Sequence, residues 1–280
     1  MPSSGPSPEP SPEPTRIVGV IPAAGRATRL GALPLSKELL PVGWRLEGGE
    51  RLPKVVSQYL IEKMQAAGAS RIYIVVRRGK WDIADYFGDG SRLGLSIAYL
   101  LVDEPYGPPF TANQAAPFVD DAIVLFGFPD ILLQPANVFS LAVGRLRASK
   151  ADIVIGTFPA RHGDSVDSVE TAPGGRVLRL VPKEDPDHAR RAAYHPTYMF
   201  AVWRPSFTAF LSADVKRLRA IAHAQGAGSL PEWPVGTVIA SAIAAGLHVD
   251  SMFYDNGRFL DIGTPDRLAA ARAKPEAWDG

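Results

Sequence analysis

Residues 16–30 read Arg-Ile-Val-Gly-Val-Ile-Pro-Ala-Ala-Gly-Arg-Ala-Thr-Arg-Leu, an apolar run followed by a loop of small residues. The run 17–21 is apolar at every position, which predicts a central strand of a parallel sheet, buried on both faces. Pro22 and Gly25 then end the strand. A loop directly after such a strand lies where open α/β sheets bind their ligands. The stretch therefore favours an α/β fold with a site close to its first strand.

The rest of the chain continues an alternation of strands and helices. Further strands are predicted at 72–76, 95–101, 122–126, 152–158, 198–203 and 248–254, and helices at 55–64, 81–87, 136–146, 205–224, 235–245 and from Thr264 onward. This order predicts an open, mostly parallel, doubly wound sheet. Residues 166–171 and 176–181 flank a Pro-Gly-Gly turn and predict a small inserted β-hairpin. The Gly- and Pro-rich segment up to about Lys54 is predicted to be a long loop.

Composition restricts the class of protein. The chain has 280 residues and a formal net charge of +1, so nucleic acid and an anionic membrane are not expected partners. It has no cysteine, which excludes disulfides, thiolate zinc sites and cysteine nucleophiles. No apolar run is long enough to span a membrane, and the amino end lacks the features of a secretory signal. We therefore expect a cytoplasmic protein.

The amino end differs in composition from the rest of the chain. Residues 1–14 read MPSSGPSPEPSPEP and contain no apolar residue after Met1 other than proline. Such a segment cannot bury enough surface to offset its ordering entropy. We expect a disordered tail over 1–14 and one folded domain over 15–280. A homo-oligomer is compatible with this organisation.

The loop after the first strand carries groups suited to phosphate. The small residues Ala23, Ala24 and Gly25 let backbone N–H groups approach phosphate oxygens. Arg29 adds a planar, permanently charged fork, and Lys37 offers a second cation on the same loop. From spacing alone, an ordinary loop with solvated charges explains the pattern equally well.

Two short motifs make the pattern specific. Residues 27–30 (ATRL) and 37–41 (KELLP) resemble the signature of the sugar-phosphate nucleotidyltransferases. Residues 22–25 resemble the uridylyl-transferring branch, and residues 88–95 (GDGSRLGL) the thymidylyl- and cytidylyl-transferring branches. The resemblance extends from about Arg16 to Leu268 and implies a Rossmann-like nucleotidyltransferase fold. The family usually has glycines at the positions of Ala24 and Ala27, where a methyl group restricts the backbone.

The resemblance also implies a magnesium site. Asp130 follows a buried strand at the position of the family's first metal ligand, although Pro129 replaces the usual glycine. Asp261, in the stretch Asp-Ile-Gly-Thr-Pro, matches the second ligand. Mg²⁺ prefers carboxylates, water and substrate phosphates, and two converging carboxylates need a cation to offset their repulsion. Without the resemblance, Asp130 is better explained as a cap of the segment that follows it.

The remaining assignments concern the two substrates. Lys183 matches the family lysine that contacts the sugar phosphate, but Pro182 stands where a glutamate usually contacts sugar hydroxyls. Glu184 lies on the opposite side of Lys183 in sequence. Gly107 matches a turn whose backbone helps to read the base, and Tyr198 matches a strand residue near the sugar. An aromatic residue on an apolar strand, such as Tyr198, is more often part of a core.

The reaction implied by the resemblance joins two substrates. A sugar-1-phosphate oxygen attacks the α-phosphorus of a nucleoside triphosphate, giving a nucleoside-diphosphate sugar and pyrophosphate, with Arg29 and Lys37 in the catalytic roles and Mg²⁺ as cofactor. Two alternatives stay open. One is a cytidylyltransferase that acts on a non-sugar phosphate, and the other is a catalytically weakened relative that binds nucleotide or nucleotide sugar and regulates a partner.

Removal of the tail is expected to leave stability and turnover unchanged. Deleting residues 1–14 removes no predicted core residue, so the melting temperature is expected to change by less than about 2 °C. Thermal denaturation and turnover of the truncated and complete chains measure this. A larger fall in either quantity would show that the tail packs on the domain or gates its site.

Overall fold

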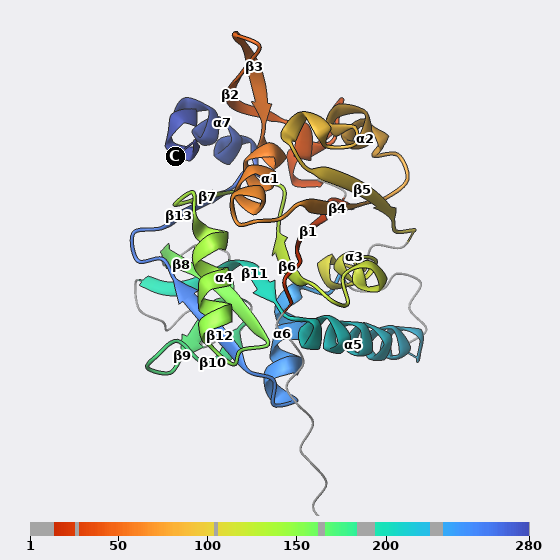
Figure 1. Ribbon diagram of the computed structural model, residues 1–280, viewed down its shortest axis with the longest axis vertical. Helices are drawn as coiled ribbons and strands as arrows, with labels where there is room; N and C mark the ends of the chain where they lie inside the picture. Colours follow the sequence, from red (N-terminus) through yellow and green to blue (C-terminus); the bar gives the residue numbers. More distant parts are fainter. Residues whose placement is uncertain are drawn as a thin grey trace, which may run out of the picture.

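The fold centres on one sheet of seven strands. The computed structural model describes residues 14–25, 28–103, 106–161, 166–183, 194–224 and 232–279. The strands lie in the order β12 (Val249–Phe253), β8 (Ile153–Arg161), β11 (Tyr194–Trp203), β6 (Ile123–Gly127), β1 (Ile17–Pro22), β4 (Arg71–Val76) and β5 (Ser96–Leu101) (Figure 1). β11 runs antiparallel to both of its neighbours, and the other neighbouring pairs are parallel. The predicted open, mostly parallel sheet is confirmed.

Helices cover both faces of this sheet. Their side chains join two hydrophobic cores, one with α1 (Val56–Ala66), α2 (Trp81–Phe87) and α4 (Val138–Ala148), the other with α3 (Pro108–Asn113), α5 (Pro205–Ala224) and α6 (Val235–Ala244). β1 contributes to both, because successive side chains of a strand point to opposite faces. Ile17 and Ile21 enter the first core, and Val18 and Val20 the second. The continuous apolar run of β1 is thus explained by its central place.

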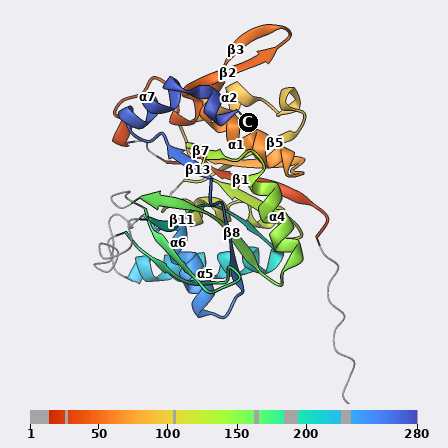
Figure 2. The same ribbon diagram turned by 90° about the vertical axis from the view of Figure 1, so that its left-hand side faces the viewer.

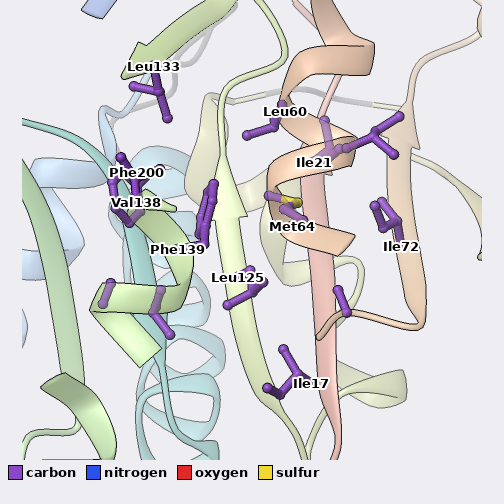
Figure 3. Packing of buried hydrophobic residues seen from close by; sticks show 14 of the residues in the cluster. Ile17, Ile21, Leu60, Met64, Ile72, Leu125, Leu133, Val138, Phe139 and Phe200 are labelled. Carbon is purple, nitrogen blue, oxygen red and sulfur yellow. The ribbon is translucent and has the colours of Figure 1, made fainter. Parts of the chain in front are cut away.

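Glycines on two central strands let α1 approach the sheet closely. A Cβ at Gly19 would lie 2.8 Å from the sulfur of Met64, and one at Gly127 would lie 2.7 Å from a methyl of Leu60. Figure 3 shows Leu60 and Met64 directed from α1 into this core, with Phe139 of α4 beside them. Close packing of this kind keeps the ends of β1 and β6 in a fixed relation.

The strand order reverses its direction of winding at β1. From β1 the chain proceeds outward on one side to β4 and β5 and then returns to β6 on the other side. Open α/β sheets bind ligands where the direction of winding reverses in this way. The loops after β1 and β6 therefore border the expected ligand site.

Over the described residues, three smaller ribbons complete the fold, and the sequence predicted one of them. β9 (Ser168–Thr171) and β10 (Val177–Val181) form the expected inserted hairpin. The predicted long loop up to Lys54 is wrong over its second half, where β2 (Pro41–Glu47) and β3 (Glu50–Val55) form a hairpin that projects from the domain (Figure 2). The third ribbon, β7 (Ile131–Gln134) with β13 (Arg258–Asp261), was not predicted.

The carboxyl end of the chain packs beside this part of the fold. α7 (Pro265–Ala273) and the 3₁₀ turn η6 (Pro275–Trp278) pack against the start of β2 and against α1 through a small separate core of Val42, Tyr59, Ala271 and Trp278. The predicted tail lies outside the described residues except for Pro14. Among the helices that the structure describes, none is long and apolar enough to cross a membrane.

The packing of β8 against β11 makes one substitution sensitive. Gly156 faces the ring of Phe200, which an added methyl group would overlap. Gly156→Ala is therefore expected to destabilise the protein by about 1–3 kcal/mol. Gly144, inside α4, has no heavy atom within 4 Å of its Cβ position, so Gly144→Ala is expected to stabilise by about 0.5–1 kcal/mol. Urea denaturation measures both free energies, and equal effects of the two changes would contradict this packing.

Candidate active site

The loop after β1 is held close to the sheet. The N–H of Ala23 donates to the carbonyl oxygen of Val75 on β4 at 2.8 Å. Ala24 is buried against Val75 and Val102, so its methyl group packs inward. A Cβ at Gly25 would meet no heavy atom within 4 Å. The methyl of Ala24 therefore does not crowd the open side of the loop. Ala27 lies outside the described residues.

Lys37 forms an ion pair with Asp130. Its ammonium nitrogen lies 2.6 Å from a carboxylate oxygen of Asp130. The Lys37 side chain is 16% exposed and that of Asp130 is 10% exposed. Lys37 begins the 3₁₀ turn η2 (Lys37–Leu39), which follows Ser36. Ser36 is anchored by two hydrogen bonds that it donates to Asp82, at 2.6 and 2.8 Å. Burial alone would lower the pKa of Lys37, but the attraction of Asp130 outweighs it and raises that pKa. The ammonium is therefore charged at neutral pH.

Arg29 forms the corresponding pair with Asp261. The guanidinium lies 3.2 Å from one carboxylate oxygen, while the other accepts the N–H of Gly263 at 2.8 Å. A Cβ at Gly263 would lie 2.6 Å from the same guanidinium, so a larger residue here would displace the Arg29 side chain. The Arg29 side chain is 62% exposed, which leaves most of its donors open to solvent.

The β7–β13 ribbon brings the two pairs together. Asp261 is opposite Ile131 in the ladder, and the N–H of Ile262 donates to the carbonyl oxygen of Asp130 at 3.0 Å. The charge of Asp261 also raises the pKa of Lys37. The two aspartates lie at neighbouring positions of the fold, but the route by which Asp261 arrives differs from the predicted one. Asp130 follows β6, as expected, whereas Asp261 arrives on a separate ribbon rather than on a strand of the main sheet.

Each predicted metal ligand already has a cationic partner in the protein. Each aspartate is paired with one of the two basic residues assigned to phosphate. The repulsion between the two carboxylates is therefore already offset before any metal ion binds. Within the described ranges, no three His, Cys, Asp or Glu side chains gather as a metal site.

A cavity of about 760 Å³ opens beside Asp130. Phe128 and Ile131, which flank Asp130 in sequence, line it together with Asp167, Lys183 and Tyr198. The backbone N–H of Lys183 donates to Asp167 at 3.1 Å, and the Tyr198 hydroxyl lies 3.5 Å from the same carboxylate. Burial raises the pKa of Tyr198, and Asp167 raises it further. The cavity thus brings together two predicted residues, Lys183 and Tyr198.

Two features of this region were missed in the sequence. Asp167 joins Lys183 to Tyr198, but nothing in the sequence marks it. Glu38, which belongs to the KELLP motif, forms a buried ion pair with Lys80 that the motif did not predict. A second cavity, of about 490 Å³, is lined by Lys37 and Arg77.

Gly107 is required by packing. Its φ is +105°, and a Cβ would overlap the backbone of Trp233, whose N–H donates to the carbonyl oxygen of Tyr106 at 3.0 Å. This contact alone explains why glycine is needed here. The glycine is therefore not by itself evidence for a role in reading a base. Pro105 and Glu184 lie outside the described residues.

Comparison with known proteins identifies relatives but no matching family profile. The chain is 26% identical over 182 residues to the bifunctional protein GlmU of Brevibacillus brevis. It is 27% identical over 179 residues to a UTP–glucose-1-phosphate uridylyltransferase of Synechocystis. A third relative, at 30% identity over 118 residues, is the low-salt glycan biosynthesis nucleotidyltransferase Agl11 of Haloferax volcanii.

These matches are partial. They cover 64%, 59% and 41% of this chain and 36%, 43% and 30% of the relatives, so the chain matches less than half the length of each. The fold comparison covers more. A solved structure named as a glucose-1-phosphate thymidylyltransferase of Bacillus anthracis, in complex with a sucrose, superposes with a TM-score of 0.74 at 16% identity, over 94% of this chain and 96% of that one.

The relatives agree with the motifs that the fold brings together at the carboxyl edge of its sheet. The chain is therefore similar, over part of its length, to sugar-phosphate nucleotidyltransferases.

Proposed function

We propose that the protein transfers a nucleotidyl group from a nucleoside triphosphate to a sugar-1-phosphate, releasing pyrophosphate. The observation that carries this proposal is the meeting of the pairs Lys37–Asp130 and Arg29–Asp261 beside β1. Two cations and two carboxylates at one point suit a substrate that arrives as an anion with its metal. The names of the relatives support the same reaction class.

The proposed reaction needs no enzyme nucleophile. A phosphate monoester oxygen is already nucleophilic, so catalysis consists of aligning two substrates and neutralising charge on the transferring and leaving phosphates. Arg29 and the loop amides of residues 23–25 would hold the triphosphate. Lys37, kept charged by Asp130, would neutralise the phosphate charge that develops on transfer.

Asp130 and Asp261 fit a magnesium ion that comes with the triphosphate. Mg²⁺ is usually held by one or two carboxylates together with substrate phosphates and water, rather than by a cage of protein ligands. The described site has two carboxylates and no third acidic or histidine ligand, which matches that mode. When bound, the ion would act as a Lewis acid on phosphate oxygens.

The exchange of ion pairs makes the proposal electrostatically consistent. Phosphate oxygens can replace the aspartates as partners of Arg29 and Lys37, and the metal can replace the two cations as partner of the aspartates. No buried charge is then left unpaired, which avoids the cost of several kcal/mol that an isolated buried ion would carry.

The sugar phosphate fits the 760 Å³ cavity. Lys183 lines it and would seat the phosphate, while Tyr198 and Asp167 supply polar groups for hydroxyls. Asp167 occupies the wall near Pro182, where the family pattern has a glutamate. This cavity adjoins Asp130 through Phe128 and Ile131, so an acceptor within it would lie next to the proposed metal.

One experiment tests the reaction class. The purified chain is incubated with Mg²⁺, a panel of triphosphates and a panel of sugar-1-phosphates, and pyrophosphate and nucleotide sugar are detected. At least one pair is expected to react. If the protein binds a triphosphate but releases no pyrophosphate with any pair, a regulatory binding role replaces the enzymatic one.

The two substrates are expected to depend on different cations. Arg29→Ala removes a charge-assisted contact worth about 1.5–3 kcal/mol, so triphosphate affinity should fall roughly 10- to 150-fold. Sugar-phosphate affinity should change little. Lys183→Ala should show the reverse pattern, and the exposed Arg147 at the end of α4 gives a control in Arg147→Ala. Titration calorimetry measures both affinities. Equal effects of both variants on both substrates would contradict this division.

Asp130 and Asp261 should act as one unit. Asp→Asn at either position is expected to lower turnover by about 100-fold or more, and the double variant should cost little beyond one change. Steady-state kinetics measure this, with Asp121→Asn, at the exposed Arg16–Asp121 pair, as control. Near-normal magnesium-dependent turnover in both single variants would refute the assignment.

The same variants should differ in stability without metal. Asp130→Asn leaves the largely buried Lys37 ammonium without its carboxylate, which costs about 1–3 kcal/mol. Asp261→Asn frees only the exposed Arg29, so its effect should stay within about 1 kcal/mol.

A further inference from the structure

An almost fully buried ion pair lies next to the proposed triphosphate site. The side chains of Glu38 and Lys80 are 1% and 5% exposed. The Lys80 ammonium donates to both carboxylate oxygens of Glu38, at 2.7 and 2.8 Å, and to the carbonyl oxygen of Ala23 at 2.8 Å. These three acceptors use all three of its protons.

The three bonds join segments that are distant in sequence. Ala23 is the first residue after β1, Glu38 belongs to η2, and Lys80 precedes α2. The carbonyl oxygen of Glu38 also accepts the hydroxyl of Ser57 on α1 at 2.6 Å. Lys37 is the neighbour of Glu38 in the chain. The pair therefore ties the loop at residues 23–25 to the segment that carries Lys37.

Stability does not explain why this pair is buried. Burial raises the pKa of Glu38 and lowers that of Lys80, and their mutual attraction opposes both shifts without cancelling them. The charged forms are thus less favourable inside the protein than in water. A buried ion pair can often be replaced by apolar residues of similar volume with no loss of stability. The geometry that the pair imposes is the property an apolar replacement would lack.

We propose that Glu38 and Lys80 are positioning residues, which hold the nucleotide-binding loop and Lys37 at the spacing that triphosphate transfer requires. This inference rests on the proposed function. Neither side chain needs to touch a substrate. Lys80 fixes the position of the Ala23 carbonyl group. Glu38 fixes the position of the turn η2, which begins at Lys37.

A double substitution separates positioning from stability. Lys80→Met alone leaves the Glu38 carboxylate buried and unpaired, so the melting temperature should fall by about 6–15 °C. The double variant Glu38→Leu/Lys80→Met removes both charges and should recover at least half of that loss. Its kcat/KM for the triphosphate should nevertheless remain roughly 100-fold below that of the parent, because small displacements of aligned groups cost that much.

Arg145→Met is the matched control. It removes one of the two partners of the buried Asp250 on β12, where His248 remains, near the amino end of that strand and away from the site. Its melting temperature should fall, while its kcat/KM stays within about twofold of the parent. All kinetics are measured well below each variant's melting temperature.

Hydrogen exchange gives a readout that does not need activity. In the double variant, the amides of Ala23 and Leu39, which donate to Val75 and Ser36, should exchange at least tenfold faster, with β1 and β4 unchanged. Parent-like kcat/KM in the double variant overturns the proposal, and so does unchanged exchange of both amides. A parent protein that is inactive with every substrate pair refutes the proposed function, and exchange alone then decides the positioning role.

Discussion

The site depends on one short antiparallel ribbon. The hydrogen bond from the Ile262 N–H to the Asp130 carbonyl oxygen, 3.0 Å long, continues the ladder of β7 and β13. It joins the segment after β6 to a segment near the carboxyl end of the chain. Both aspartates sit at the end of that ladder, so their convergence is fixed by backbone bonds rather than by flexible side chains. Arg29 and Lys37 then pair with carboxylates whose positions are already set.

The sequence predicted correctly those helices and strands whose own residues show a clear apolar pattern. β1 is apolar throughout because helices cover both of its faces, and α2 and α5 begin and end where their patterns predicted. The ribbons β2–β3 and β7–β13 were missed for a physical reason. Arg258–Asp261 has only four residues and no alternation of apolar and polar side chains, and its partner lies more than a hundred residues earlier. Its strand conformation comes from tertiary pairing, which no local pattern reports.

The candidate site was predictable in its residues but not in its connections. The motifs named Arg29, Lys37, Asp130 and Asp261, and the structure brings these four together. The pairing of each cation with a carboxylate could not be read from the sequence, because it depends on how two loops meet. Asp167 shows the same limit, since only the folded chain places it between Lys183 and Tyr198.

Solvent exposure divides the charges of this region into two classes. The Glu38–Lys80 pair is almost fully buried, and a buried ion pair exchanges partners only at a large desolvation cost. The Arg29–Asp261 pair is largely open, and exposed pairs of this kind contribute little stability and re-form easily. Lys37 stands between them, with one side toward Asp130 and its backbone on the turn that Glu38 holds. A site that must exchange its ion pairs for a charged ligand, yet keep its geometry, needs both classes. In the proposed reaction, the buried pair would keep the loop and the turn in place while Arg29 and Lys37 change partners.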